Sequence, residues 1–255
     1  MTLLKKKNMA RQAGRGHRDQ VATLAIDIGG TGLKAAVLDR KGSMLAGRVR
    51  VETPDPAPPD VMIDALAALV KPLPPFDRVS IGFPGVVRDG CVMTAPHFGN
   101  RRWHRFPLAA ALGNRLGHKP VRLLNDAEVQ GYGVIRGRGL EFVISLGTGL
   151  GSALFRDGEL MPHLEFAQFP FKARTFNRYV GDDALDKVGK KKWNARIAKM
   201  IDAFRTLLNF DTLYIGGGNT RKLSIKLPRN VKIVSNDAGL TGGIRLWEDK
   251  KTVSR

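Results

Sequence analysis

One short stretch near the start of the chain decides the fold: Leu24-Ala25-Ile26-Asp27-Ile28-Gly29-Gly30-Thr31-Gly32-Leu33-Lys34. An apolar run that ends in an acid and a glycine pair is typical of a buried strand followed by a turn. A second apolar run follows at once, so we predict a hairpin of strands over 21–27 and 33–38. The stretch has neither P-loop nor Rossmann spacing, because no Gly-Lys-Ser/Thr closes it and no helical pattern opens directly after it.

The glycine turn of this stretch has the composition of a phosphate-binding loop. Glycines let backbone N–H groups approach an anion without interference from Cβ, and Thr31 adds a hydroxyl donor. Asp27 ends the strand beside the turn, where an acid can hold a water on Mg²⁺. Lys34 either offsets phosphate charge or faces solvent. Taken alone, the turn is also compatible with a glycine hairpin that binds no ligand.

Two further glycine loops stand at the ends of predicted strands. Gly147-Thr148-Gly149-Leu150-Gly151 lies between strands predicted at 142–145 and 152–155, and it again alternates glycine with a hydroxyl. Gly216-Gly217-Gly218 ends a strand predicted at 212–215 and could admit a flat base or more phosphates. Three such loops at strand ends are hard to explain as turns alone, so we predict a phosphate-binding site.

A candidate general base lies between the first two loops. Asn125 and Asp126 follow a strand predicted at 121–124 and precede a helix predicted at 127–135. Phosphoryl transfer needs a group that accepts the proton of the nucleophile, and an acid in this position can do so. The alternative is that Asn125 or Asp126 only caps the helix. The local sequence leaves both interpretations open.

Strands and helices alternate along the rest of the chain, which indicates an α/β fold. The longest predicted helix covers 182–208, where Trp193, Ile197, Ile201 and Phe204 form one apolar stripe. The other predicted elements are strands at 44–51, 78–83 and 231–234 and helices at 60–70, 106–116 and 238–247.

Composition limits the class of protein. The chain has 255 residues, of which 43% are hydrophobic, so it is long enough for two lobes and is not wholly disordered. Its net charge of +19 suggests a polyanionic partner such as nucleic acid, an anionic membrane surface or a phosphate chain. Residues 1–20 hold six Lys or Arg against one Asp, and we predict a disordered basic tail there.

The single cysteine, Cys91, excludes an internal disulfide framework and a zinc site of several thiolates. No apolar run approaches the length of a transmembrane helix, and no apolar segment follows the basic start as in a signal peptide. We therefore expect a cytoplasmic protein without membrane contact.

In order, these motifs carry a family resemblance that covers roughly residues 21–245. Asp27 with Gly29–Gly32, Asn125-Asp126, Gly147–Gly151 and Gly216–Gly218 resemble the phosphate segments, connecting acid and adenosine segment of the actin-like sugar kinases. Within that group, Gly82-Phe83-Pro84-Gly85 and Thr94-Ala95-Pro96 resemble the ROK family of repressors, open reading frames and sugar kinases. Gly29–Lys34 and the pair Arg221-Lys222 are most similar to its polyphosphate glucokinase branch.

The resemblance implies a two-lobed actin-like, or ribonuclease H-like, fold of mixed sheets with flanking helices. The small lobe is expected at 21–115 and the large lobe at 116–236, with a closing helix at 237–255 that packs back on the small lobe. The resemblance also implies a homodimer.

The same resemblance implies a Mg²⁺-dependent sugar kinase that moves a phosphoryl group from polyphosphate or ATP to a hydroxyl of a glucose-like sugar or polyol. Asp126 would deprotonate that hydroxyl, and Asp27 would hold Mg²⁺ through water. The residues implied for the donor are Gly29, Gly30, Thr31, Gly32, Lys34, Gly147, Thr148, Gly149 and Gly151 for phosphate, and Gly216, Gly217 and Gly218 for nucleotide.

The sugar pocket departs from the family pattern. Ala-Pro-Asn-Leu of the family reads Ala-Pro-His97-Phe here, and Glu-x-Gly-His reads Glu165-Phe-Ala-Gln168. Both replacements still form hydrogen bonds but with a different reach, so glucose itself is in doubt. The family's zinc cysteines are absent, and we expect no zinc. The sugar-binding set that the resemblance implies is Gly82, Pro84, Gly85, His97, Asn125, Asp126, Glu165 and Gln168.

Two other functions remain as alternatives. A non-catalytic sensor would bind nucleotide or polyphosphate with an altered sugar pocket. A nucleic-acid-binding protein would use the basic tail and the cations Lys190-Lys191-Lys192, but it lacks any recognised reading motif, so we do not expect a nucleic-acid partner. His163, beside Pro162, we expect to be a loop residue rather than a ligand.

Overall fold

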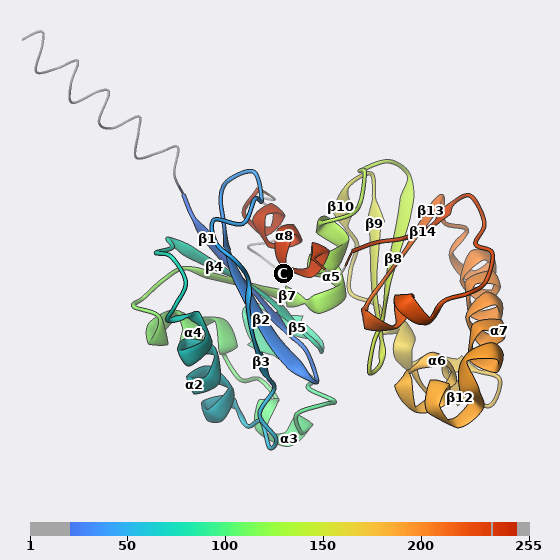
Figure 1. The fold of residues 1–255 in the computed structure, drawn as a ribbon, viewed down its shortest axis with the longest axis horizontal. Coiled ribbons are helices and arrows are strands. Elements are labelled where there is room, and N and C mark those ends of the chain that lie inside the picture. Colours follow the sequence, from blue (N-terminus) through green and yellow to red (C-terminus); the bar gives the residue numbers. More distant parts are fainter. Residues whose placement is uncertain (1–20, 236, 249–255) are drawn as a thin grey trace, which may run out of the picture.

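The computed structural model describes residues 21–235 and 237–248, and two sheets dominate it (Figure 1). The first sheet has five strands in the order β3-β2-β1-β4-β7. β1 and β2 form the predicted antiparallel hairpin, and β1, β4 and β7 run parallel. The strands are β1 (Thr23–Ile28), β2 (Gly32–Leu38), β3 (Val49–Glu52), β4 (Arg78–Phe83) and β7 (Val121–Asn125).

The second sheet also has five strands, in the order β10-β9-β8-β13-β14. It repeats the plan of the first, because an antiparallel hairpin of β8 and β9 lies beside parallel strands. The strands are β8 (Leu140–Leu146), β9 (Leu150–Arg156), β10 (Glu159–Leu160), β13 (Thr212–Gly216) and β14 (Val231–Ile233). The mixed sheets with flanking helices confirm the predicted α/β class.

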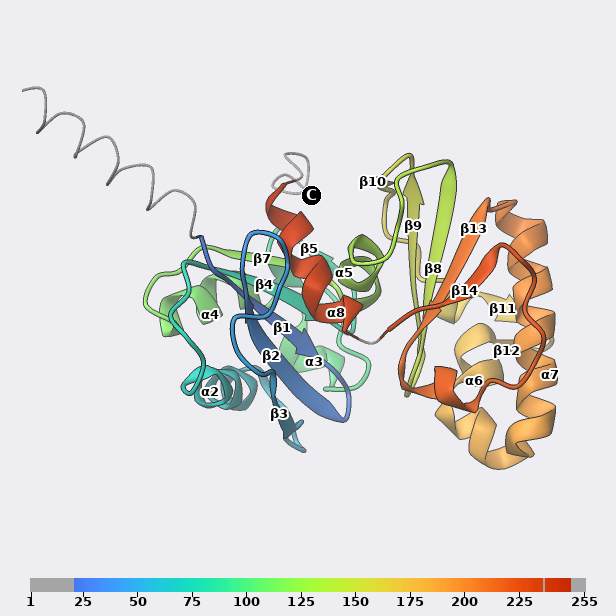
Figure 2. The same ribbon diagram turned by 45° about the horizontal axis from the view of Figure 1, so that its top comes forward.

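Helices cover both outer faces and fill the space between the sheets (Figures 1 and 2). α2 (Pro59–Val70) and α4 (Leu108–Arg115) pack on the first sheet, with the short α3 (Asn100–Trp103) nearby. α6 (Phe176–Val180) and α7 (Asp182–Leu208) pack on the second.

α5 (Asp126–Tyr132) and α8 (Ala238–Thr241) lie between the sheets. β7 ends at Asn125 and α5 begins at Asp126, and both residues line the cleft described below. Smaller elements are the hairpins β5 (Val87–Arg88) with β6 (Cys91–Val92) and β11 (Pro170–Phe171) with β12 (Arg174–Thr175), and the 3₁₀ helices η1 (Phe166–Gln168), η2 (Gly218–Lys222) and η3 (Gly242–Trp247).

The long helix α7 follows the predicted range and stripe, with one difference. Trp193, Ile197, Ile201 and Phe204 are buried against the second sheet as predicted. The backbone at Gly189 has φ 74° and ψ 160°, which interrupts the helix. Glycine adopts positive φ at little steric cost, so one predicted helix is in fact two segments joined at this residue.

The C-terminal segment returns to the first sheet. Ser80 Oγ donates a hydrogen bond to the Gly243 carbonyl at 2.7 Å and accepts one from Trp247 Nε1 at 2.8 Å. The helix predicted at 238–247 is shorter than expected, because η3 replaces it from Gly242 onward. A Cβ at Gly242 would lie 1.9 Å from the Val129 carbonyl oxygen, so close backbone approach requires glycine there.

Several boundaries differ from those expected. The strand predicted at 44–51 begins at Val49, and α5 ends at Tyr132. The small lobe was expected to end at residue 115, but β7, which comes later in the chain, pairs with β4 in the first sheet. The limits of the two lobes stay a prediction. The predicted tail at 1–20 and the end of the closing segment, 249–255, lie outside the described residues. In the described part of the chain, every helix is too short or too polar to cross a membrane.

Candidate active site

A cleft of about 750 Å³ opens between the two sheets, and the predicted motifs converge on it. The first two glycine loops line it, together with Gly217 and Gly218 of the third. Gly82 and Gly216 do not line it and serve packing instead: a Cβ on Gly82 would lie 3.3 Å from Asp126 Cα, and one on Gly216 would lie 2.4 Å from Gln130 Nε2. The other predicted residues at the cleft are Asp27, Lys34, Pro84, Gly85, His97, Asn125, Asp126, Glu165 and Gln168.

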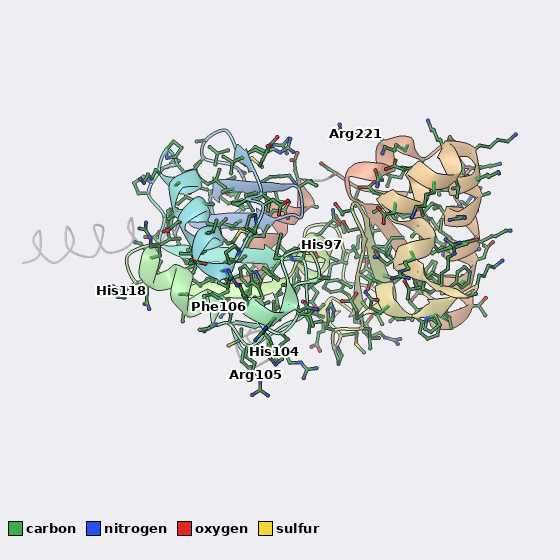
Figure 3. The ribbon with its side chains drawn as sticks, turned by 90° about the horizontal axis from the view of Figure 1, so that it is seen from below. His97, His104, Arg105, Phe106, His118 and Arg221 are labelled. Carbon is green, nitrogen blue, oxygen red and sulfur yellow. The ribbon has the colours of Figure 1, made fainter. Side chains whose placement is uncertain are left out.

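The first two glycine loops face each other across the cleft. A Cβ on Gly30 would lie 3.7 Å from Thr148 Oγ1 and 3.6 Å from His97 Cγ. His97 thus lies beside both loops, because its Nε2 would be 3.8 Å from a Cβ on Gly149 (Figure 3). This arrangement brings the two loops together at one place in the cleft, and each turn is closed by a backbone hydrogen bond, from the Gly29 N–H to the Gly32 carbonyl and from the Gly147 N–H to the Gly149 carbonyl.

Buried and half-buried amides fix the second loop. The Leu150 N–H donates to Asn177 Oδ1 at 2.8 Å, and Asn219 Nδ2 donates to the Gly147 carbonyl at 3.1 Å. Asn219 also donates to Asp182 Oδ1 at 2.6 Å. The loop is therefore held from α6 and from the third glycine segment, two contacts that the local sequence could not indicate.

Gly217 shows why the third loop needs glycine. Its φ is +91°, and a Cβ there would lie 2.2 Å from the Leu146 carbonyl oxygen. Any other residue would be strained in this conformation and would collide with backbone. The backbone that follows β13 is thereby brought directly against Leu146, the last residue of β8.

Asn125 is the residue that caps α5. Its Oδ1 accepts a hydrogen bond from the Ala127 N–H at 2.9 Å, and its own N–H donates to Glu128 Oε2 at 3.1 Å, which completes a capping box. Its Nδ2 donates to the Gly85 carbonyl at 3.1 Å. The buried side chain of Asn125 therefore ties the helix to the turn after β4.

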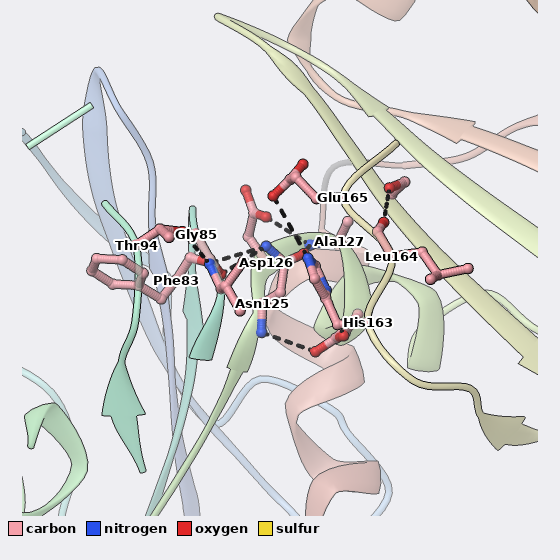
Figure 4. Close-up of polar contacts among 12 residues, drawn as sticks. Phe83, Gly85, Thr94, Asn125, Asp126, Ala127, His163, Leu164 and Glu165 are labelled. Carbon is pink, nitrogen blue, oxygen red and sulfur yellow. Dashed lines mark hydrogen bonds and ion pairs between the residues drawn. The ribbon is translucent and has the colours of Figure 1, made fainter. Parts of the chain in front are cut away.

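Asp126 is the first residue of α5, and its carboxylate faces the cleft (Figure 4). A Cβ on Gly151 would lie 3.7 Å from Asp126 Oδ1, so the carboxylate lies beside the second glycine loop. Burial, followed by the negative charges of Asp27, Glu165 and Glu128, raises the pKa of Asp126 to about 7. A carboxylate with a pKa near neutrality is well suited to accept a proton.

A row of charged side chains crosses the first sheet at the cleft. Asp27, Lys34 and Arg50 occupy paired positions on β1, β2 and β3. Lys34 Nζ lies 2.8 Å from Asp27 Oδ2. The sequence left open whether Lys34 offsets phosphate charge or faces solvent; in the structure it forms an ion pair with Asp27 in the cleft wall. The motifs gave no indication of Arg50, whose side chain also lines the cleft.

The chemistry of the donor set fits Mg²⁺. This ion is held in proteins by one or two carboxylates together with water and substrate phosphates. Asp27 offers the oxygen that Lys34 does not contact, and Asp126 lies near enough for its pKa to respond to the charge of Asp27. Among residues 21–235 and 237–248, no three His, Cys, Asp or Glu side chains form a complete metal cage.

Glu165, Gln168 and two histidines, His97 and His163, also line the cleft. Desolvation lowers the pKa of His97. Gln168 is exposed at the end of η1. His163, which we expected to be a loop residue, does lie outside helices and strands, but its ring lines the cleft between Glu128 and Glu165. Burial opposes its charge, yet the hydrogen bond to Glu128 and the nearby carboxylates of Glu128 and Glu165 raise its pKa to about 9.

With this geometry in view, comparison with known proteins identifies the family. A sequence model of the ROK family matches residues 23–162, more than half of the chain. The chain therefore belongs to the ROK family.

Individual relatives are kinases. The chain is 28% identical over 233 residues to a polyphosphate glucokinase of Mycobacterium tuberculosis (strain H37Ra), which spans 85% of this chain and 88% of the relative. It is 38% identical over 149 residues to an N-acetylmannosamine kinase of Escherichia coli (strain SE11), covering 55% of this chain and 50% of the relative.

A solved structure supports the same assignment. The inorganic polyphosphate/ATP-glucomannokinase of Arthrobacter sp. strain KM matches with a TM-score of 0.80 and 29% identity, over 88% of this chain and 97% of that one. The predicted actin-like fold is thereby confirmed, and the prediction of a sugar kinase agrees with these relatives.

Proposed function

We propose that this chain is a Mg²⁺-dependent phosphotransferase that moves a phosphoryl group from polyphosphate or ATP to a hydroxyl of a glucose-like sugar or related polyol. One observation carries the proposal: Asp126, with a pKa near 7, faces a cleft lined by all three glycine loops. A base and a phosphate cradle in one cleft are the two parts that phosphoryl transfer to a hydroxyl needs.

In this proposal Asp126 accepts the proton of the acceptor hydroxyl as the oxygen attacks the terminal phosphorus of the donor. The loops Gly29–Gly32 and Gly147–Gly151 would bind the donor oxygens through the N–H groups that are not used in hydrogen bonds of the protein itself, while Gly217 and Gly218 would lie under the nucleotide. Asp27 would hold Mg²⁺, which when bound neutralises charge on the phosphates. The work of the protein is then mostly positioning and charge stabilisation.

Cations in the cleft support a polyanionic donor. Lys34, Arg48, Arg50 and Arg221 all line it, and Figure 3 labels Arg221. Polyphosphate and ATP both suit such a lining, and the M. tuberculosis and Arthrobacter relatives are named for polyphosphate use. We therefore propose that either donor is accepted.

The acceptor side supports a sugar or polyol of altered shape. Glu165, Gln168 and His97 offer hydrogen-bonding groups for hydroxyls. The packing contacts of Gly82 and Gly85 would bring the turn after β4 to the same place. A homodimer, implied by the resemblance, and a cytoplasmic location, expected from the sequence, belong to this proposal, and light scattering tests the first.

The test is a screen for phosphate transfer across hexoses, N-acetylhexosamines and polyols, run with ATP and with polyphosphate in parallel in the presence of Mg²⁺. We expect at least one donor and acceptor pair to give a sugar phosphate. Each pair is also tested for binding by calorimetry, so that binding and transfer are separated.

The second candidate is a sensor that binds ligands without chemistry. It is favoured by one observation, the exposed Gln168 at the position where the family pattern has a histidine. Binding of sugar and nucleotide without transfer for every pair would support the sensor and contradict the kinase.

A further inference from the structure

His163 is a buried cleft residue that the reaction proposed above does not use. Its side chain is only 17% exposed, and it lies between two glutamates that belong to different elements. Glu128 comes from α5, whereas Glu165 directly precedes η1.

One side of the ring is firmly attached to α5. His163 Nδ1 lies 2.9 Å from Glu128 Oε1, and Glu128 Oε2 accepts the Asn125 N–H at 3.1 Å. Glu128 is thus fixed at the start of the same helix that carries Asp126. The ring of His163 therefore has a fixed place relative to the general base.

The backbone beside His163 is attached to the second sheet. Ser152 Oγ donates to the Leu164 carbonyl at 3.0 Å, and the Met161 N–H donates to the Leu154 carbonyl at 2.8 Å. Both partners lie on β9. With its ring on α5 and its backbone on β9, His163 links two elements of the cleft.

The other side of the ring points at Glu165. His163 Nε2 lies 3.6 Å from Glu165 Oε2, which is beyond hydrogen-bond distance (Figure 4). This nitrogen is buried and has no hydrogen-bond partner among the described residues. An unpaired buried donor is costly, and the Glu165 side chain, 37% exposed, needs only a small shift to meet it.

The negative charges around His163 also favour a contact between its Nε2 and Glu165. Asp126 and Glu165 line this part of the cleft, Glu128 is buried beside His163, and the negative charges of Glu165 and Glu128 raise the pKa of Asp126. A protonated imidazole between the two glutamates reduces their mutual repulsion. Gln168 does not take this role, because it is exposed and only its backbone N–H reaches this segment, as the donor to the Glu165 carbonyl at 3.1 Å.

We propose that His163 is a positioning residue, which holds the Glu165 carboxylate toward the acceptor hydroxyls while Glu128 orients its ring. This inference deepens the proposed function and rests on it.

The experiment is a double-mutant cycle of His163→Gln and Glu165→Gln. Binding of the acceptor is measured by calorimetry, and its KM and kcat by phosphate transfer. His163→Gln should weaken acceptor binding about tenfold, because a hydrogen bond to a charged group is lost. The donor KM should stay unchanged. His104→Gln, an exposed histidine outside the cleft, is the matched control.

The cycle separates positioning from a general structural role. In the Glu165→Gln background the His163→Gln change should have no further effect on acceptor affinity. An equal loss in both backgrounds, or no loss in either, would overturn the inference. Thermal unfolding checks that each variant is folded, and His163→Asn repeats the cycle if the glutamine variant is not.

The same data keep this inference apart from the proposed function. If the wild type transfers phosphate and His163→Gln leaves acceptor affinity unchanged, only the inference fails. If the wild type binds a sugar but transfers nothing, the kinase proposal fails, and the binding cycle still tests His163. If it binds no sugar at all, both fail.

Discussion

The part of the cleft proposed to bind the phosphoryl donor, the donor side, and the part proposed to bind the acceptor, the acceptor side, are built in different ways. On the donor side, the three glycine loops present backbone, and the close approach of Gly217 to Leu146 leaves no room for a side chain. On the acceptor side, His97, Glu165, Gln168 and His163 present side chains from loops and a short 3₁₀ helix.

The difference explains which part of the family pattern is retained. A backbone site depends on strand register and on the absence of Cβ, so it survives many changes elsewhere in the sequence. A side-chain site changes its specificity with each substitution. We therefore propose that this chain combines the donor side of its family with an altered acceptor side.

The largest expected effect is that of a substitution at Asp126, which lies between the donor side and the acceptor side. Asp126→Asn should lower kcat by about 10²–10⁴-fold, because the acceptor hydroxyl loses its base. Affinity for donor and acceptor should change little. Steady-state kinetics and calorimetry measure the two separately, with the exposed Asp186→Asn as the control.

Thermal unfolding of Asp126→Asn shows whether the loss of activity could come from a loss of stability. The pKa of Asp126 is raised above its ordinary value, so ionisation destabilises the folded state as pH rises from about 4 to 7. Asp126→Asn should therefore unfold at the same or a higher temperature than the wild type at pH 8. A strong loss of stability would contradict the assigned environment of this carboxyl.

The next effect is the pH dependence of the wild type. Only ionised Asp126 accepts a proton, and its pKa is about 7. Below that pH the active fraction falls tenfold per unit, so kcat/KM at pH 5 should be about 100-fold below its plateau. A flat pH profile down to pH 5, measured with folding checked at each pH, would contradict the raised pKa.

A third prediction tests the backbone nature of the donor side. Gly217→Ala should destabilise the protein by about 3 kcal/mol, from its positive φ and its collision with Leu146. Gly218→Ala, one residue further along, should fold normally, because a Cβ there meets nothing within 4 Å. Denaturant unfolding compares the two; equal stability would contradict the close approach.

The smallest effect concerns the acceptor side. The double variant His97→Asn with Gln168→His restores the family residues, and we expect its kcat/KM for glucose to change about tenfold. The donor KM should stay within error, since neither side chain holds the glycine loops by a hydrogen bond. Kinetics with glucose and with the preferred acceptor check this, and an equal change for both acceptors would show that the two positions do not determine specificity.

Local patterns were sufficient to predict from the sequence the strand ends at which the glycine loops and Asp126 lie; their role in binding the donor stays a prediction. Asp27 and the Gly29–Gly32 turn lie at a strand end that apolar periodicity identifies. Asp126 follows β7 in the same way. The ion pair of Lys34 with Asp27 could not be predicted in this way, because it depends on the register of β1 and β2, which places the two residues opposite each other.

The acceptor side shows where sequence reasoning stopped. His163 contacts Glu128, 35 positions away along the chain, so no local spacing indicates the pair. Arg50 reaches the cleft only through the pairing of β3 with β2. Gly216 carries a recognised motif yet packs against Gln130, because a motif does not show which of its glycines reaches the ligand.

The central claim is that the donor side works together with Asp126 although the acceptor side has changed. The most direct measurement is transfer of labelled terminal phosphate by the wild type at pH 8, from ATP and from polyphosphate, to each sugar and polyol of the screen. We predict transfer to at least one acceptor with a kcat of about 1 s⁻¹ or more. Binding of donor and acceptor without transfer for any pair would contradict the account.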